Sequence, residues 1–183
     1  MLIFLLVVFA LPVAIGVVLY ANDWRPIGSS YGELLQPPQL LSIPELNPLQ
    51  GKPVDAQAWK DKWHLVYVAS ASCNAECRNG LHAMRQIHVS LANESIRLQR
   101  VWLVDGPTMP ELQTLQSQYP DMWVLTDAAV LARQLEKSVA PNADGRIYLV
   151  DPLGNLVISY PRGSDSNGIR KDLMKLLKHA WAG

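Results

Sequence analysis

Two cysteines four residues apart are the residues of this sequence best suited to chemistry. They are Cys73 and Cys77, within the segment ASASCNAECR at positions 69–78, and the chain has no other cysteine. On a helix, residues at this spacing share a face with their α carbons roughly 6 Å apart, a separation that a disulfide tolerates. The two sulfurs can therefore form a disulfide or bind a metal ion together.

The surroundings of the pair favour a reactive thiol. A helix is expected to begin at the cysteines, and the amide groups and dipole at a helix N-terminus favour thiolate over thiol. Arg78 would strengthen this effect, whereas Glu76 would oppose it. Two other interpretations stay open, an inert disulfide or cysteines used as small buried hydrophobes. An inert disulfide would stabilise the fold little, because a four-residue bridge closes only a tiny loop.

The elements that must position the pair alternate between strand and helix. Runs rich in Val, Leu, Ile and Tyr predict strands at residues 64–70, 98–104, 122–126, 147–151 and 156–160. Apolar residues three and four apart predict helices over residues 78–93, 109–118 and 166–181, and another that contains residues 130–135. This order predicts an α/β three-layer sandwich. Cys73 directly follows the first buried strand, at the strand end where chemistry collects in such folds.

An uncharged N-terminal run predicts a transmembrane anchor over residues 1–22. Residues 2–20 carry no charged side chain and are about long enough for a helix to cross a bilayer core of roughly 30 Å. A cleaved signal peptide is the alternative, but its apolar region is usually shorter and ends at a small-residue cleavage site. Tyr20 and Trp24 suit the headgroup region at the outer end of the run, which favours a retained, single-pass anchor.

The side of the membrane is predicted from the cysteines rather than from flanking charges. No Lys or Arg precedes the span and Arg25 follows it, which by charge alone would leave the C-terminal domain in the cytoplasm. Paired cysteines favour the oxidising side, because cytoplasmic dithiols are generally kept reduced. We therefore expect a bacterial inner-membrane protein whose C-terminal domain is periplasmic.

Beyond the anchor, composition predicts a tether over residues 23–54 and one domain over residues 55–183. The tether contains six of the thirteen prolines of the chain, which disfavour regular ladders, but its leucines indicate that part of it packs on the domain. The 16 basic and 16 acidic residues cancel, and neither sign forms a long block. A nucleic-acid partner is therefore not expected.

The order of a buried strand, CNAEC, a helix and then IYLVDPLGNLV resembles the Sco/SenC proteins, over residues 55–181. These are membrane-anchored, thioredoxin-fold copper chaperones and thiol oxidoreductases that serve assembly of the copper centre of cytochrome c oxidase. The resemblance implies a thioredoxin-like fold with a mixed central sheet. It also implies that Cys73 and Cys77 are redox thiols and ligands of Cu(I), and that the partner is a cytochrome oxidase subunit or another copper chaperone.

The sequence departs from the Sco pattern at two places. Sco proteins usually have a proline after the second cysteine, where this chain has Arg78, and a histidine ligand shortly before the IYLVD-like strand. Here that stretch is PNADGR, and its Asp144 is a hard oxygen ligand that suits Cu(I) poorly. Arg146 either pairs with a thiolate or is an exposed strand-end arginine. The four histidines are predicted to be surface or packing residues: His64, His82, His88 and His179.

Three hypotheses for function are left open. The first is a thiol-disulfide oxidoreductase that acts on the cysteines of an oxidase copper site, with copper left open as a cofactor. The second is a Cu(I)-binding chaperone, and the third is a non-catalytic assembly factor. The redox role ranks above copper carriage because the usual histidine is missing. One dedicated partner is favoured, because Gly145 and Arg146 stand where thioredoxins have the cis-proline that receives many substrates.

Overall fold

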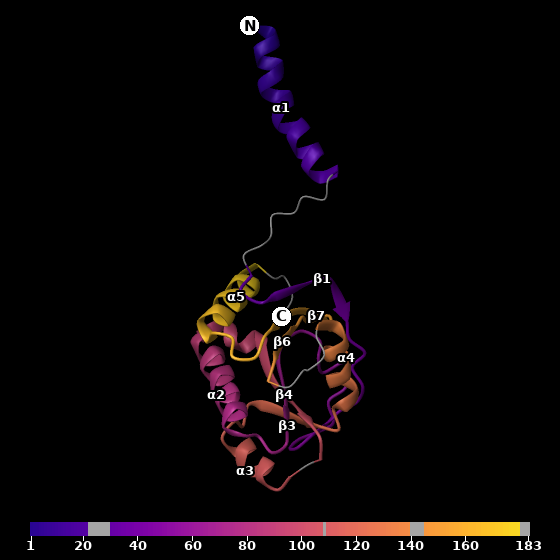
Figure 1. Cartoon of the computed structure of the whole chain (residues 1–183), viewed down its shortest axis with the longest axis vertical. Helices are drawn as coiled ribbons and strands as arrows, with labels where there is room; N and C mark the ends of the chain where they lie inside the picture. Colours follow the sequence, from indigo (N-terminus) through magenta and orange to yellow (C-terminus); the bar gives the residue numbers. More distant parts are fainter. Residues whose placement is uncertain (22–29, 108, 140–144, 180–183) are drawn as a thin grey trace.

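A mixed sheet of seven strands forms the centre of the computed structural model, which describes residues 1–21, 30–107, 109–139 and 145–179 (Figure 1). The strand order is β1-β7-β6-β3-β4-β5-β2. In chain order the strands are β1 (Glu33–Leu40), β2 (Asn47–Pro48), β3 (Trp63–Ser70), β4 (Leu98–Asp105), β5 (Met122–Thr126), β6 (Ile147–Val150) and β7 (Asn155–Tyr160). Strands β3, β4 and β5 run parallel, and the other neighbours pair antiparallel.

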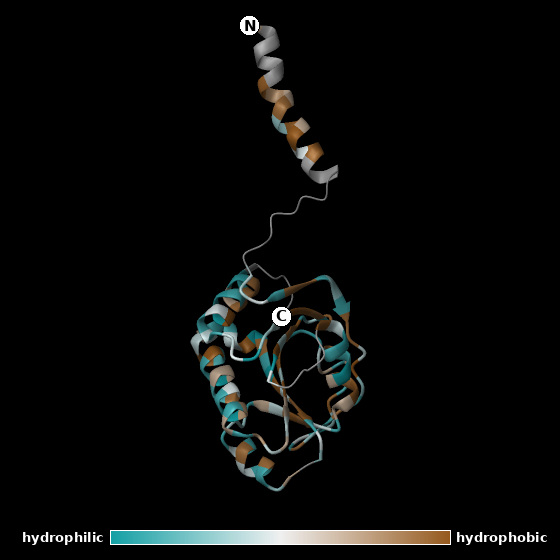
Figure 2. Cartoon of the chain, in the orientation of Figure 1, coloured by the Kyte–Doolittle hydropathy of each residue, from teal (hydrophilic) through white to brown (hydrophobic). Residues whose placement is uncertain are grey.

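Helices cover both faces of this sheet, so the predicted three-layer α/β architecture is confirmed. The helices are α1 (Leu2–Ala21), α2 (Ala75–Ser90), the 3-10 helix η1 (Ala92–Arg97), α3 (Glu111–Ser117), α4 (Ala129–Val139) and α5 (Ser166–His179). Helices α2, α3 and α5 contribute to the core on one face, and α4 contributes to the core on the other. In Figure 2 hydrophilic and hydrophobic residues alternate along α2, α4 and α5, as expected for helices with one buried face.

Strand β3 lies in the middle of the sheet and holds the two cores together. Its residues alternate between the faces, with Leu65 and Tyr67 in the core beneath α2, and Val66 and Val68 in the core beneath α4. All but its last residue are buried, as expected for a strand covered on both faces. Such a strand is a rigid support for the residues that follow it.

The N-terminal segment joins the domain before the predicted start at residue 55. Strand β1 pairs with β7 and forms one edge of the sheet, and the short β2 pairs with β5 at the other edge. Most side chains of β1 are exposed, which suits an edge strand that contains Pro37 and Pro38. The packed part of the chain therefore extends back to the first described residues after α1.

Helix α1 precedes this segment, and Figure 1 shows it outside the layered domain. Every described side chain from residue 8 to residue 18 is exposed. Among the residues whose side chains are described, no helix combines the length and the apolar character needed to cross a membrane.

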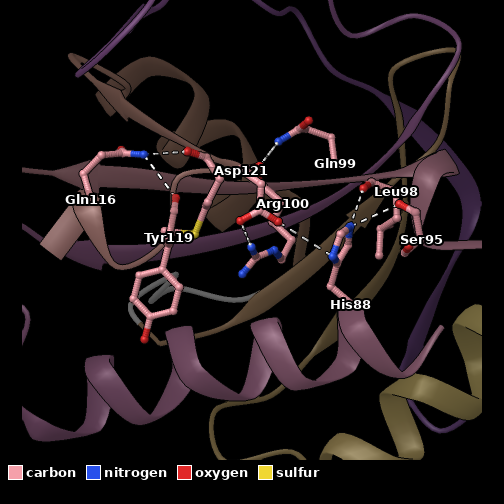
Figure 3. A network of polar contacts seen from close by, with 9 residues as sticks. His88, Ser95, Leu98, Gln99, Arg100, Gln116, Tyr119 and Asp121 are labelled. Atoms are coloured by element: carbon pink, nitrogen blue, oxygen red, sulfur yellow. Dashed lines mark hydrogen bonds and ion pairs between the residues drawn. The ribbon is translucent and has the colours of Figure 1, made fainter. Parts of the chain in front are cut away.

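The amino ends of β4 and β5 are joined by a polar network (Figure 3). The guanidinium of Arg100, which is 1% exposed, donates a hydrogen bond from Nη2 to Oδ1 of Asp121. Nδ1 of His88 lies 3.9 Å from the other oxygen of that carboxylate. The side-chain amide of Gln116 donates to the carbonyl oxygens of Tyr119 and Met122, at 3.2 and 3.0 Å. This network fixes the end of the sheet opposite the cysteines.

Candidate functional site: a disulfide at the carboxyl end of β3

Cys73 and Cys77 are joined by a disulfide directly after β3. Their α carbons are 5.1 Å apart, within the range expected for a bridge. Cys73 is 3% exposed and Cys77 is 6% exposed, so the bridge is mostly covered by protein. The bridge lies where the parallel strands end and α2 begins, which is the usual place for chemistry in an open α/β sheet.

The backbone around the disulfide is held by local hydrogen bonds. The amide of Cys73 donates to the carbonyl of Ser70 at 3.2 Å, which folds the chain back at the end of β3. Cys73 has a φ of +27°, an unfavourable conformation for a residue other than glycine. Asn74 caps α2, because its side-chain oxygen accepts a hydrogen bond from the amide of Cys77 at 3.0 Å. The cap and the disulfide together fix the first turn of α2.

Charged side chains surround the pair from two sides. Nε of Arg78 donates to the carbonyl oxygen of Cys73 at 3.3 Å. The carboxylate of Glu76 is paired with both Nε and Nη2 of Arg162, which lies in the turn after β7. Because Arg162 compensates the charge of Glu76, that carboxylate opposes a neighbouring thiolate less than the sequence alone suggests.

A pocket of about 230 Å³ opens beside Cys73. Its walls come from the cysteine loop, the first turn of α2 and helix α3, and its described lining residues are Ala71, Ser72, Cys73, Arg78, Glu111, Thr114, Leu115 and Gln118. Cys73 belongs to this lining and Cys77 does not, among the residues described. A partner that enters the pocket would therefore meet Cys73 first.

Arg146 does not face a thiol. Its Nη2 forms an ion pair with Glu33 at 2.6 Å, and its Nε donates to the hydroxyl of Ser159 at 3.3 Å. These contacts tie β1 to β6 and β7 at the end of the sheet that carries the disulfide. The hypothesis that Arg146 stabilises a thiolate is therefore wrong. Arg78, which contacts Cys73, and Arg162, which pairs with Glu76, are the arginines next to the disulfide.

The histidines lie away from the disulfide as packing or surface residues, as far as the structure describes their side chains. His64 stacks on Trp59 with ring centroids 4.3 Å apart, in the core beneath α4. His82 pairs with Gln86, and His88 hydrogen bonds to the carbonyls of Ser95 and Leu98. Within the described part of the chain, no three His, Cys, Asp or Glu residues come together as a metal site. The segment of residues 140–144, with Asp144, lies outside the described residues.

Sequence reasoning missed the long-range members of the site. Arg162 is 86 residues from Glu76, and nothing in the sequence near either residue links them. Glu111 begins α3 and Gln118 directly follows it, and the position of this helix against the cysteine loop follows only from the packed fold. The two cysteines could be predicted because their function depends on neighbours in sequence. The cap at Asn74 was not predicted, although a capping residue at the start of a helix is also a local signal.

Solved structures share this fold. The chain is similar to yeast Sco1 with copper bound, at 19% identity over 78% of this chain and 95% of that chain, with a TM-score of 0.65. It is similar to BsSco, a member of the Sco family of cytochrome c oxidase assembly proteins with a disulfide switch, at 17% identity over 81% and 98%, with a TM-score of 0.62. A thiol:disulfide interchange protein of the thioredoxin family from Chlorobium tepidum matches at 16% identity over 76% and 96%, with a TM-score of 0.61. These likenesses confirm the expected thioredoxin-like fold with a mixed sheet.

No curated protein sequence matches the chain. A family model does match it, the transmembrane-like, thioredoxin-like, C-terminal domain, over residues 63–180. The match runs from β3 to the end of α5 and includes both cysteines. The chain therefore belongs to the family of transmembrane-like, thioredoxin-like C-terminal domains.

Proposed function

We propose that this protein is a membrane-anchored thiol redox protein that acts on the copper-site cysteines of a cytochrome oxidase partner. The observation that carries the proposal is the Cys73–Cys77 disulfide, which lies at a helix N-terminus beside an open pocket. The fold shared with Sco proteins, one of them described as having a disulfide switch, supports it. The partner is an oxidase subunit or another protein of its copper supply.

The reaction is a thiol-disulfide exchange in two steps. In the reduced protein, the thiolate of Cys73 attacks a disulfide of the partner, and one partner sulfur leaves as a thiolate that takes up a proton. The thiolate of Cys77 then attacks Cys73 in the mixed disulfide and releases the second partner sulfur. The partner gains two thiols and this protein gains its disulfide, which another dithiol protein must reduce before the next cycle.

Anchoring by residues 1–22 is part of the proposal. The uncharged run over residues 2–20 and the exposed apolar side chains of α1 support a lipid environment for this helix. A disulfide at the candidate site supports the oxidising side of the membrane. We accordingly infer a single-pass protein of a bacterial inner membrane, with the domain in the periplasm.

Copper carriage fits the donor set less well. The copper-bound yeast Sco1 shares the fold, but the site here offers only the two sulfurs of Cys73 and Cys77. The described lining of the pocket contains no histidine and no methionine. Soft Cu(I) would have two thiolates after reduction and no third soft ligand from these residues. Titration of the reduced protein with Cu(I) against a moderate chelator tests this conclusion, and competition with that chelator would restore the chaperone hypothesis.

The double variant Cys73→Ser/Cys77→Ser in the full chain tests the proposed function. We expect loss of cytochrome oxidase activity in cells that depend on this protein, while the variant accumulates in membranes at the normal level. The variant Cys73→Ala/Cys77→Ala serves as a matched control for side-chain polarity and should fail equally. Normal oxidase activity with either variant would reject the redox role and favour a non-catalytic assembly factor.

A further inference from the structure

A cluster of contacts binds the first residues after the anchor to the domain. The amides of Tyr31 and Gly32 donate to the carboxylate of Asp172 at 3.0 and 2.9 Å, and the hydroxyl of Ser30 donates to it at 3.3 Å. Asp172 lies on α5 and is 5% exposed. Three donors converge on this buried carboxylate, which makes the attachment specific. We call residues 30–32 with Asp172 the N-terminal clasp.

Small residues allow the clasp to close tightly. A Cβ atom at Gly32 would come within 2.4 Å of Ile158 and 2.5 Å of Tyr160, and one at Gly168 would come within 2.4 Å of the Tyr31 ring. The hydroxyl of Tyr31 also accepts a hydrogen bond from the amide of Asp165 at 2.8 Å. The clasp is therefore packed as well as hydrogen bonded, and it fixes residues 30–32, the first described residues after α1, on the domain.

The clasp lies at the disulfide end of the domain. Strand β1 begins opposite Ser159 near the end of β7, and β6 begins opposite Tyr67 near the end of β3. The ion pair of Glu76 with Arg162 also places the disulfide near the clasp. Glu76 directly precedes Cys77, and Arg162 lies three residues before Asp165, whose amide contacts Tyr31 of the clasp. The clasp and the disulfide thus share one end of the sheet, and the Arg100–Asp121 network marks the opposite end.

The chain between anchor and clasp is too short to turn the domain over. From Ala21 to Ser30 there are nine Cα steps, which span at most roughly 30 Å when fully extended. A compact domain of about 150 residues is roughly 40 Å across. If the opposite end of the domain faced the bilayer, the clasp would lie about one domain diameter from the bilayer surface. That distance is longer than the greatest span of the chain between Ala21 and Ser30.

From this we infer that the N-terminal clasp holds the disulfide end of the domain toward the membrane surface, so that its partner is a membrane protein whose thiols lie in the layer next to the bilayer. The inference rests on the anchor proposed above. It assigns to Asp172 and Tyr31 the role of orienting the domain, separate from any part in thiol chemistry.

Depth measurement in vesicles tests this orientation. Asn167→Cys places a fluorophore on the first turn of α5 at the disulfide end, and Asn93→Cys places one in η1 at the opposite end; both asparagines are exposed. The full chain is inserted into phosphatidylcholine vesicles that carry nitroxide-labelled headgroups. We expect the Asn167 label to be quenched several-fold more strongly than the Asn93 label. Both labels are also measured in the Cys73→Ser/Cys77→Ser background, so the outcome does not depend on the redox role.

Two further variants test whether the clasp and the short chain before it cause the difference in quenching between the two labels. Insertion of about twenty Gly and Ser residues between Gly28 and Ser29 lengthens the chain between anchor and clasp by up to roughly 70 Å. It should abolish the difference in quenching between the Asn167 and Asn93 labels without changing the domain. Asp172→Asn should reduce the contrast by loosening the clasp. Equal quenching of the two labels in the parent chain, stronger quenching at Asn93, a contrast that survives the insertion, or absence of the chain from the vesicles would each overturn the inference.

Discussion

Glu76 lies between the two cysteines in sequence, and alone its carboxylate would disfavour a neighbouring thiolate. The ion pair with Arg162 compensates this charge from a turn far along the chain. The side chain of Arg162 also lies against Gly145, where a Cβ atom would be 3.1 Å from it. Arg162 therefore connects the cysteine loop with the start of β6 and the turn after β7.

Removal of this arginine should make the disulfide harder to reduce. In Arg162→Ala, the uncompensated charge of Glu76 would destabilise the thiolate form by about 0.5–1 kcal/mol, as expected for an exposed charge in the first turn of a helix. This corresponds to a reduction potential lower by about 10–20 mV, measured against a glutathione couple. The double variant Glu76→Gln/Arg162→Ala should return to the parent value, and Arg170→Ala serves as a control. A parent-like potential in Arg162→Ala would contradict this role.

His64 shows a second residue whose environment decides its chemistry. It is fully buried between Trp59 and Trp123, with ring centroids 4.3 and 5.7 Å away. Neither ring nitrogen makes a well-formed hydrogen bond in the described part of the chain, and the backbone of Lys62 offsets the effect of burial on the pKa only in part. Burial lowers its pKa from 6.5 to about 3, so the ring is neutral in the folded protein above that pH.

Replacement of His64 by phenylalanine should remove an acid sensitivity of the fold. Below about pH 6.5 the unfolded chain binds a proton at this histidine, and the folded protein cannot do so until about pH 3, so stability falls across this range. His64→Phe keeps the ring stack and has no such proton to bind. Urea unfolding should show a smaller loss of stability between pH 7 and pH 4.5 than in the parent or in the exposed control His82→Phe. An equal loss in all three would contradict the assignment.

At the scale of elements, the central strands could be predicted because their apolar runs are continuous. Strand β5 occupies the predicted residues, and β3 and β4 differ from prediction by one residue at an end. Helix α2 begins at Ala75, three residues before the predicted start, because Asn74 caps it. Strand β1 was predicted only as a packed part of the tether, since Pro37 and Pro38 interrupt its pattern and its edge position leaves most of its side chains exposed.

The ion pair of Arg100 with Asp121 holds the amino ends of β4 and β5 together. Partial burial of Asp121 would raise its pKa, but the hydrogen bond and charge of Arg100 outweigh this and lower the pKa below its usual 3.8. A carboxyl group with a lowered pKa stabilises the fold above about pH 4, and this contribution is lost as the pH falls through its folded pKa. Asp121 thus adds to acid sensitivity in a lower range than His64.

Asp121→Asn should destabilise the domain at neutral pH and flatten its response to acid. The buried guanidinium of Arg100 loses its charged partner, at a cost of about 1–3 kcal/mol in the free energy of unfolding. Denaturant unfolding at pH 7 measures this loss, and a series below pH 4 should show a smaller further decline than in the parent. Asp105→Asn, at the other end of β4, provides the matched control. An unchanged free energy at pH 7 would show that Arg100 finds another partner.

At the scale of the whole molecule, the domain should need the clasp and β1 to fold well. A chain that begins at Ser30 keeps both, and we expect a soluble domain with cooperative unfolding. A chain that begins at Leu41 exposes the edge of β7 and leaves the buried Asp172 without its three donors, which should cost at least about 3 kcal/mol. Thermal unfolding and light scattering compare the two. Equal stability of the two chains would show that residues 30–40 pair with the sheet without stabilising the domain.

Only those features of the candidate site that are formed by residues close together in sequence could be predicted. The spacing of Cys73 and Cys77 and the strand-to-helix junction can be read from neighbouring residues. The contact of Arg162 with Glu76, the clasp on Asp172 and the wall of α3 join segments that are distant in sequence. Such contacts depend on how the strands are ordered in the sheet. The spacing of apolar residues along the sequence does not determine that order.

The central claim is that the Cys73–Cys77 pair cycles between disulfide and dithiol. The most direct measurement is acid quenching of cells that express the full chain, followed by alkylation with a maleimide reagent that shifts mobility on a gel. We predict a mixture of oxidised and reduced protein at steady state, a fully reduced pool after brief treatment with a mild reductant, and return of the disulfide after washing. A pair that stays oxidised throughout would contradict the account and leave the disulfide as a structural link.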